Sequence, residues 1–133
     1  MVQKMRTISE KQVSAVIKLP APKRYSHFIK EVAGWEEVWG LYQDGWALAT
    51  NSENEFFLPV WPAREYAELC RGTTWSDYEA KSICLYDFME RLLPDLSNEG
   101  ILPCIFYLPT DKGIIPKLEL LLEDLKTELD RYL

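Results

Sequence analysis

The spacing of apolar positions predicts helices at both ends of the chain around a strand-rich middle. Ser9 and Gln12 have the spacing of a capping box, so a first helix is expected from Ser9 to just before Pro20. Pro20 and Pro22 then favour the start of a second helix, since proline fits a first helical turn. Its apolar stripe is formed by Tyr25, Phe28, Ile29 and Val32. Gly34 is expected to cap its C-terminal end.

Residues 35–62, WEEVWGLYQDGWALATNSENEFFLPVWP, switch to an alternating pattern and hold four of the five tryptophans. Asp44-Gly45 predicts a two-residue type I′ hairpin in which Tyr42 faces Ala47. In that register one face presents Trp39, Leu41, Trp46 and Leu48, and the other presents Gly40, Tyr42, Ala47 and Ala49. Both faces are apolar, so we expect a central hairpin that is at least partly covered on each side.

The rest of the chain predicts further strands and helices in turn. A strand is expected over residues 55–61, with Pro59 marking an edge or its end, because proline has no N–H to donate to a ladder. Pro62 then starts a helix with Tyr66, Leu69 and Cys70 turned inward. Residues 83–93 have helical spacing, and residues 101–109 read as a strand whose Pro103 indicates an edge or a bulge. Pro116 opens a last helix with Leu118, Leu121, Leu122, Leu125 and Leu129 on one face.

These elements predict the α+β class, with a mostly antiparallel sheet whose central Asp-Gly hairpin is packed by the N-terminal and C-terminal helices. The length of 133 residues indicates one domain over residues 1–133. Residues 1–8 precede the first helical signal and are expected to be a flexible N-terminus.

Net charge, apolar runs and cysteine spacing each argue against certain classes of function. The net charge of −6 disfavours nucleic acid as a partner, because an acidic protein repels phosphates. The apolar runs are too short to span a membrane, and the N-terminus lacks the apolar core of a signal peptide, so a cytoplasmic location is expected. Cys70, Cys84 and Cys104 stand among apolar neighbours without a C-x-x-C spacing, which is typical of buried, reduced thiols.

Residues with catalytic or metal-binding patterns are scarce. The sequence contains no phosphate-binding glycine loop, no H-E-x-x-H and no G-x-S-x-G. Its single histidine, His27, lies beside the apolar stripe of the second helix and is expected to pack at the helix flank. We therefore expect no catalytic residues, no metal and no cofactor.

The tryptophans are the most informative residues for function. Trp39 and Trp46 are expected to belong to the core, because aromatic rings bury large areas that a small domain needs. The neighbours of other rings are proline or polar residues, which favours an exposed binding fringe formed by Trp35, Glu36, Glu37, Trp61 and Trp75. In this hypothesis the rings anchor a partner protein while carboxylates pair with its Lys or Arg. The chain would then be a non-enzymatic interaction domain for a protein with a basic surface.

Two other readings stay open at this stage. A small-molecule binder or small enzyme would need a concave, Trp-lined pocket with at least two converging polar side chains. A homodimer would form through an edge strand or the leucine-rich last helix, although Pro59 and Pro103 argue mildly against open edges.

The chain also resembles a small bacterial family catalogued as a domain of unknown function, DUF2750. The resemblance rests on LPAPKRYSHFIKEVAGWEEVWGLYQDGWALA, LPVWPAREYAELC, DFMERLLPDLSNEGI and the acidic, leucine-rich end, and it spans residues 13–133. It implies a compact α+β, bacterial, cytoplasmic protein, with no established activity to carry over. LPVWPAREYAELC is also loosely similar to a strand-then-helix piece of secretion-associated and toxin-immunity proteins.

Overall fold

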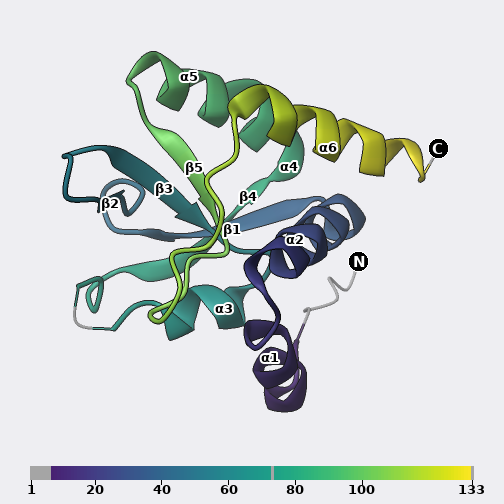
Figure 1. The fold of residues 1–133 in the computed structure, drawn as a ribbon, viewed down its shortest axis with the longest axis horizontal. Helices are drawn as coiled ribbons and strands as arrows, with labels where there is room; N and C mark the ends of the chain where they lie inside the picture. The colour runs from purple at the N-terminus through teal and green to yellow at the C-terminus, as the bar shows by residue number, and fades with distance from the viewer. Residues whose placement is uncertain (1–6, 73, 133) are drawn as a thin grey trace.

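Two small sheets surrounded by helices make up the fold in the computed structural model, which describes residues 7–72 and 74–132 (Figure 1). The elements are α1 (Glu10–Ile17), α2 (Ala21–Trp35), β1 (Glu37–Tyr42), β2 (Ala49–Thr50), β3 (Phe56–Val60), α3 (Arg64–Leu69), β4 (Glu79–Cys84), α4 (Leu85–Asp87), the π-helical segment η1 (Phe88–Leu92), α5 (Leu93–Asn98), β5 (Leu102–Ile105) and α6 (Leu118–Asp130). Mixed helix and strand in a single compact domain confirm the α+β class. No helix in the described part of the chain is long and apolar enough to cross a membrane.

The first two helices follow the sequence prediction at their starts. The hydroxyl of Ser9 accepts a hydrogen bond from the backbone N–H of Gln12, with 3.2 Å between the two atoms, so the predicted cap is confirmed. The end of α2 differs from the prediction. Gly34 stays helical, and the cap is Glu36, whose left-handed backbone (φ 58°) lets its N–H donate to the Val32 carbonyl. Gly34 instead gives room to Tyr132, because an added Cβ would lie 3.2 Å from the tyrosine oxygen.

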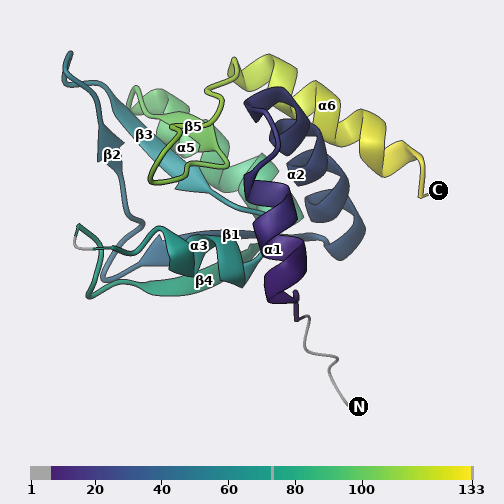
Figure 2. The same ribbon diagram turned by 60° about the horizontal axis from the view of Figure 1, so that its bottom comes forward.

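The strands form two sheets that meet at one pair of tryptophans. The first sheet pairs β1 with β4 in antiparallel fashion, and the second has the order β2-β3-β5, with β2–β3 antiparallel and β3–β5 parallel. Trp39 and Trp61 exchange two backbone hydrogen bonds, of 2.9 and 2.8 Å, and so connect the sheets. Helix α3 lies against the β1–β4 sheet, while α2 packs beside α6 (Figure 2).

The predicted two-residue Asp-Gly hairpin is wrong in its register, although a turn does form at Asp44-Gly45. Tyr42 bridges to Trp46 rather than to Ala47, and the N–H of Gln43 donates to the carbonyl of Gly45. The turn is therefore one residue longer than predicted, and the paired faces change with it. Beyond this bridge β1 pairs with β4, which supplies a six-residue ladder that the segment after Trp46 does not.

The shifted turn places the Trp46 ring against Gly40. An added Cβ at Gly40 would lie 2.9 Å from the Cε3 atom of Trp46, closer than such contacts normally are. The ring also packs edge-on against Tyr42, with centroids 5.1 Å apart, and the Lys81 ammonium lies 3.9 Å from the Tyr42 ring centre. The absence of a side chain at Gly40 therefore makes room for the Trp46 indole.

The prolines of the second sheet behave differently from each other. β5 is an edge strand, as Pro103 indicates, but β3 is the middle strand, so Pro59 does not mark an edge strand. The missing N–H is tolerated because β2 pairs only with Phe56 and Phe57, and the Trp39 bridge begins only at Trp61. Pro59 falls in the gap between these two pairings.

The helical stretch after β4 contains a π turn with an identifiable cause. The N–H of Leu93 donates to the carbonyl of Phe88, five residues earlier. Pro94 follows immediately; its ring would clash with the carbonyl four residues before it in a regular helix, and it has no N–H to donate. The wider turn accommodates this proline, and the helix continues into α5.

The core confirms most of the predicted stripes and corrects several single residues. Leu121 and Leu125 of α6 are fully buried. Leu69, expected to face inward, is exposed, because α3 ends there and turns Tyr66 and Ala67 to the core instead. Cys70 and Cys104 are buried as predicted, but Cys84, the last residue of β4, is exposed.

The expected flexible N-terminus falls largely on residues 1–6, which lie outside the described residues. Ile8, also assigned to it, is buried in the core, and its N–H donates to the Glu65 carboxylate over 3.1 Å.

Arg24 is buried (2% exposed) on α2, so its charge needs partners. One guanidinium nitrogen donates to the Leu19 carbonyl over 2.6 Å, and another pairs with the exposed carboxylate of Asp111 over 2.9 Å. Asp111 also accepts the N–H of Gly113 over 2.9 Å. The Gly113 N–H, and next the Arg24 guanidinium, hold the pKa of Asp111 below its usual range. This pair ties the start of α2 to the loop after β5.

We expect Gly40→Ala to lower the free energy of unfolding by about 1–3 kcal/mol, because the new methyl group displaces the Trp46 ring. In a Trp46→Leu background the same change should cost less than about 1 kcal/mol, since the clash is gone. Urea denaturation of the four variants of this cycle measures both numbers. Equal costs in the two backgrounds would refute the close contact.

Asp111→Asn is expected to lower stability by about 1 kcal/mol at neutral pH, a value already discounted for solvent screening. The lowered pKa in the folded state means that the carboxylate stabilises the fold above the unfolded-state pKa of 3.8 and loses this effect as pH falls. The difference between wild type and variant should therefore be constant from pH 7 to about 5 and shrink below that range. Urea denaturation at several pH values checks it; a difference that grows toward low pH would contradict the pairing.

Candidate functional site

The end of α2 and the start of α4 are held together through the backbone of Glu36. Its carbonyl accepts the N–H of Leu85 over 2.9 Å, while its own N–H caps α2. Trp35, the last residue of α2, and Tyr86, in the first turn of α4, therefore emerge close to the same junction. A residue with positive φ that is not glycine stores backbone strain, and such positions cluster at functional sites.

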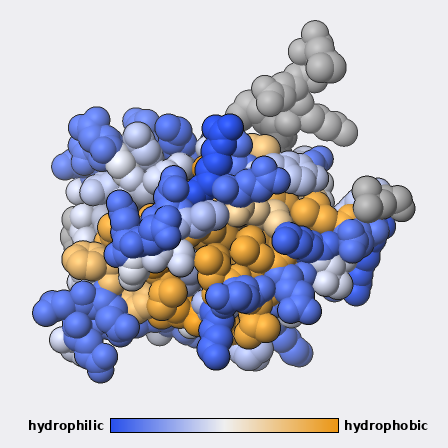
Figure 3. Space-filling view, turned by 90° about the horizontal axis from the view of Figure 1, so that it is seen from above, coloured by the Kyte–Doolittle hydropathy of each residue, from blue (hydrophilic) through white to orange (hydrophobic). Residues whose placement is uncertain are grey.

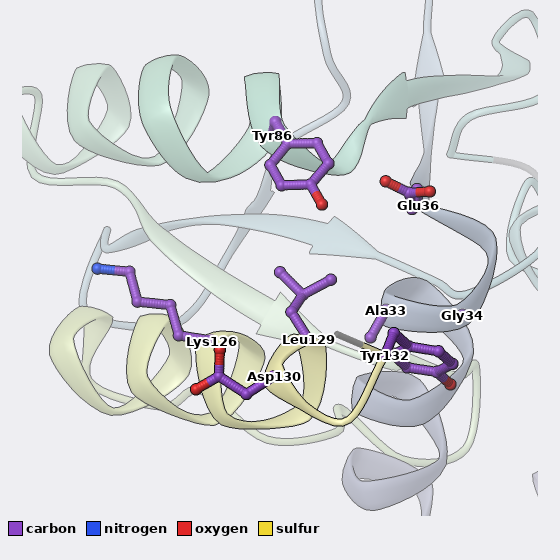
Figure 4. A pocket seen from close by; sticks show the side chains of 8 residues that line it. All are labelled: Ala33, Gly34, Glu36, Tyr86, Lys126, Leu129, Asp130 and Tyr132. Carbon is purple, nitrogen blue, oxygen red and sulfur yellow. The ribbon is translucent and has the colours of Figure 1, made fainter.

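A cavity of about 420 Å³ lies at this junction, between the end of α2, the start of α4 and the end of α6. Its lining residues are Ala33, Gly34, Glu36, Tyr86, Lys126, Leu129, Asp130 and Tyr132. Figure 4 shows Tyr86 and Leu129 pointing toward each other from opposite walls, with Lys126 and Asp130 on α6 and Tyr132 beside Gly34. The floor is thus apolar and the rim carries the charges.

A second hollow, also of about 420 Å³, continues along the outer face of α6 and shares Lys126 and Asp130 with the first. It adds Glu119 and Glu123 to the lining. We call the two adjoining hollows the α2–α6 groove. Its charged lining residues are Glu36, Lys126, Asp130, Glu119 and Glu123. Carboxylates outnumber ammonium groups, so the groove favours a positively charged ligand.

Two aromatic residues that line the first hollow, Tyr86 and Tyr132, are exposed, and so is Trp35, which precedes the lining residue Glu36 in the chain. Trp35 is 48% exposed, Tyr86 43% and Tyr132 61%. The Glu36 carboxylate, through a side-chain hydrogen bond and then its negative charge, raises the pKa of Tyr86. Figure 3 shows apolar residues gathered in the middle of the face over α5 and α6, with hydrophilic residues around them. Apolar surface with a charged rim is typical of interaction sites.

The predicted fringe residues separate into two groups. Trp35 and Glu36 are both exposed, as expected, but only Glu36 lines the groove; their binding role stays a prediction. Glu37 is half-buried on β1, where its carboxylate accepts the indole N–H of Trp39 over 3.1 Å. The Glu37 carboxylate is therefore already engaged in a hydrogen bond within the protein.

The expectation that Trp61 and Trp75 are exposed is wrong. Trp61 is fully buried, and its indole N–H donates to the Tyr107 carbonyl over 2.6 Å. Trp75 is 7% exposed and packs edge-on against Tyr107, with ring centres 5.7 Å apart. Their polar and proline neighbours did not determine burial, because partners far along the chain satisfy the indoles.

Trp39 and Trp46, expected in the core, are half-buried instead. Each is covered on one side by a cation: Arg64 lies 5.1 Å from the centre of the Trp39 ring, and Lys81 lies 5.9 Å from that of Trp46. Both rings thus pack against other side chains of the fold without being fully buried.

Sequence reasoning missed Tyr86, Asp130 and Tyr132 as groove residues. The sequence marks these residues only as aromatic or charged side chains that lie outside the periodic apolar positions. Such residues are common on any helix. The tertiary packing of α6 beside α2 brings them together, supported by the hydrogen bond between Tyr25 and Asp124, with 2.6 Å between the oxygens.

The two buried thiols, Cys70 and Cys104, do not offer a nucleophile. Burial raises the pKa values of Cys70 and Cys104 to about 12, so both are protonated at neutral pH. Their sulfurs lie 3.1 and 2.9 Å from the carbonyl oxygens of Tyr107 and Lys112, to which they donate. Within residues 7–72 and 74–132 there is no group of three or more His, Cys, Asp or Glu placed to hold a metal ion.

Glu36→Gly should raise the free energy of unfolding by about 0.5–1 kcal/mol, because glycine adopts the left-handed cap conformation without a Cβ clash. Glu36→Gln keeps the strain and should leave stability within about 0.5 kcal/mol of wild type. Urea denaturation of both variants separates backbone strain from side-chain charge. A loss of stability in the glycine variant larger than that in the glutamine variant would contradict the strained cap.

One of three comparisons with known proteins identifies a family for this chain. Searches of the curated proteins and of the solved structures found no match. A family model described as "Protein of unknown function (DUF2750)" matches residues 25–125, which include most of α2, both sheets and most of α6. The chain therefore belongs to the DUF2750 family.

Proposed function

We propose that this chain is a non-enzymatic cytoplasmic binding protein that captures a basic segment of another protein in the α2–α6 groove. One observation carries the proposal: the exposed rings of Tyr86 and Tyr132 line a hollow together with Glu36 and Asp130, and the exposed ring of Trp35 precedes Glu36 in the chain. Aromatic anchors with a charged rim are the usual composition of interface hot spots.

The charges of the groove specify the partner's chemistry. Glu36 and Asp130 flank the first hollow, and Glu119 and Glu123 extend the negative surface along α6, with Lys126 as the cation between them. The whole chain carries −6, so its field also attracts a positive partner over a distance. A segment with two or more Lys or Arg residues fits this surface better than a neutral one.

The mode of binding follows from the shape of the groove. An Arg or Lys side chain can lay its aliphatic stem along Leu129 and the Tyr86 ring, and place its charged end between the two rim carboxylates. Neighbouring cations of the segment would then lie along α6. The protein would act by occlusion, covering the partner's basic surface in the manner of an immunity protein.

The test is capture of a partner followed by measurement with the purified pair. Tagged wild type is used to pull down proteins from a lysate of the source organism, and the retained protein is identified, purified and titrated by calorimetry. We expect Trp35→Ala or Tyr86→Ala to weaken binding by about tenfold or more, and Glu36→Gln/Asp130→Asn to do the same. The association rate should fall as salt rises, because carboxylates steer the encounter.

A matched control lies outside the groove. Glu79→Gln removes an exposed carboxylate of β4, which does not line either hollow, and should leave the affinity within about twofold. Equal weakening by Glu79→Gln and by Glu36→Gln/Asp130→Asn would contradict a specific groove. A retained protein that binds all groove variants with wild-type affinity would refute the site.

The homodimer reading predicts a different result from the same material. If the groove binds a second copy of the chain, light scattering would show twice the monomer mass, and Tyr86→Ala would restore the monomer. A monomer mass at high concentration would exclude it.

A further inference from the structure

A second hollow surface lies at the other end of the molecule, around β2 and the loop that follows α3. In Figure 1 this region and the C-terminal end of α6 are at opposite ends of the long axis. One cavity of about 420 Å³ includes Arg71 and Trp75, and another of about 280 Å³ includes Lys112 and Phe57. They share Ala49, Thr50 and Tyr107, so they adjoin. We call them the β2 double pocket.

The β2 double pocket has the opposite charge from the α2–α6 groove. Among the described residues that line the larger cavity, Arg71 is the single charged side chain, and in the smaller cavity it is Lys112. Of the residues that the structure describes, no Asp or Glu lines either part, although the chain holds 21 acidic residues against 15 basic ones. An acidic protein that keeps carboxylates out of a cavity and places a cation in each half presents a site for an anion.

Arg71 is held in place and retains unused donors. One of its terminal nitrogens donates to the Ser76 carbonyl over 2.7 Å, which fixes the guanidinium against the loop. Its Nε is buried and has no hydrogen-bond partner in the described part of the chain. A planar guanidinium with free donors binds a carboxylate or phosphate through paired hydrogen bonds.

The walls of the larger cavity add flat apolar surface and further donors. Trp75 and Tyr107 stand edge to face, at 65° between their planes, and both contribute to the lining. Thr50 and Thr74 add hydroxyl groups at the rim. The Tyr107 carbonyl already accepts the Trp61 indole and the Cys70 thiol, so it is occupied and does not repel an anion at full strength. These are the aromatic surface and converging polar groups of a small-ligand site.

We propose that the β2 double pocket binds a small organic anion, a molecule with a flat ring and a carboxylate or phosphate group. The ring lies against Trp75 and Tyr107, and Arg71 pairs with the anionic group. Lys112, in the adjoining cavity, is placed for a second negative group. This site is separate from the α2–α6 groove and uses none of its residues.

The probes are phenyl phosphate, benzoate and neutral benzyl alcohol, each titrated into isotopically labelled protein while amide and indole NMR signals are followed. We expect saturable shifts of the Thr50 and Gly72 amides and of the Trp75 indole with at least one anion. Benzyl alcohol should bind about tenfold more weakly, because it cannot form the charged hydrogen bonds. The tighter of the two anions identifies phosphate or carboxylate as the preferred group.

Charge variants locate the anion. Arg71→Gln should weaken the better anion by about tenfold, and Arg71→Lys should recover part of the loss. Lys112→Gln should weaken it by about threefold, since a nearby exposed charge contributes less. Lys30→Gln, which removes an exposed cation on α2 that lines neither part of the β2 double pocket, is the matched control and should leave binding unchanged.

The outcomes separate clearly. The proposal is overturned by no saturable shift with either anion or by equal binding of benzyl alcohol. It is also overturned by undiminished binding in a folded Arg71→Gln or, if that variant does not fold, by undiminished binding in Lys112→Gln. Lys112 is exposed, so its variant tests the site even if Arg71→Gln does not fold. The β2 double pocket and the α2–α6 groove share no residue. A negative result for anion binding therefore leaves the protein-binding proposal unaffected, and a negative result for protein binding leaves the anion proposal unaffected.

Discussion

The two hydrogen bonds between the backbones of Trp39 and Trp61 join the two sheets of this protein, and much of the fold depends on that contact. Sheet β1–β4 and sheet β2-β3-β5 are otherwise separate ladders. The Trp61 ring, fully buried, ties the joint to the segment after β5 through the Tyr107 carbonyl. Gly40, next to Trp39, then leaves space for Trp46. One tryptophan pair thus positions the sheets, the loop after β5 and the β2 double pocket.

Local signals were sufficient for the helices but not for the sheets. The Ser9 cap and the leucine stripe of α6 depend on neighbours within a few residues, and both are found in the structure. The Asp-Gly turn is equally local, yet β1 pairs with β4, a partner beyond two intervening strands. Whether a strand prefers its neighbour or a distant one depends on burial across the whole domain, which residue spacing does not encode.

The sequence predicted only part of the candidate site, for the same reason. Trp35 and Glu36 lie just beyond the Gly34 cap that the sequence predicted for α2, and they are exposed as expected. Tyr86 and Tyr132 reach the groove only because α4 and α6 pack beside the end of α2. Trp61 lies between Val60 and Pro62, and its indole N–H reaches an acceptor 46 residues away in the chain. Single-residue context therefore could not rank the tryptophans.

The proline in β5 has a consequence for self-association. Pro103 offers no N–H to a strand of another molecule, and Ile105, near the end of β5, is already paired with Ile114. The opposite edge of that sheet is β2, which is only two residues long. The exposed positions of β4 include Glu79 and Lys81, which discourage stacking of like strands. A chain with 17 aromatic residues is thereby left with few backbone edges on which a fibril could grow.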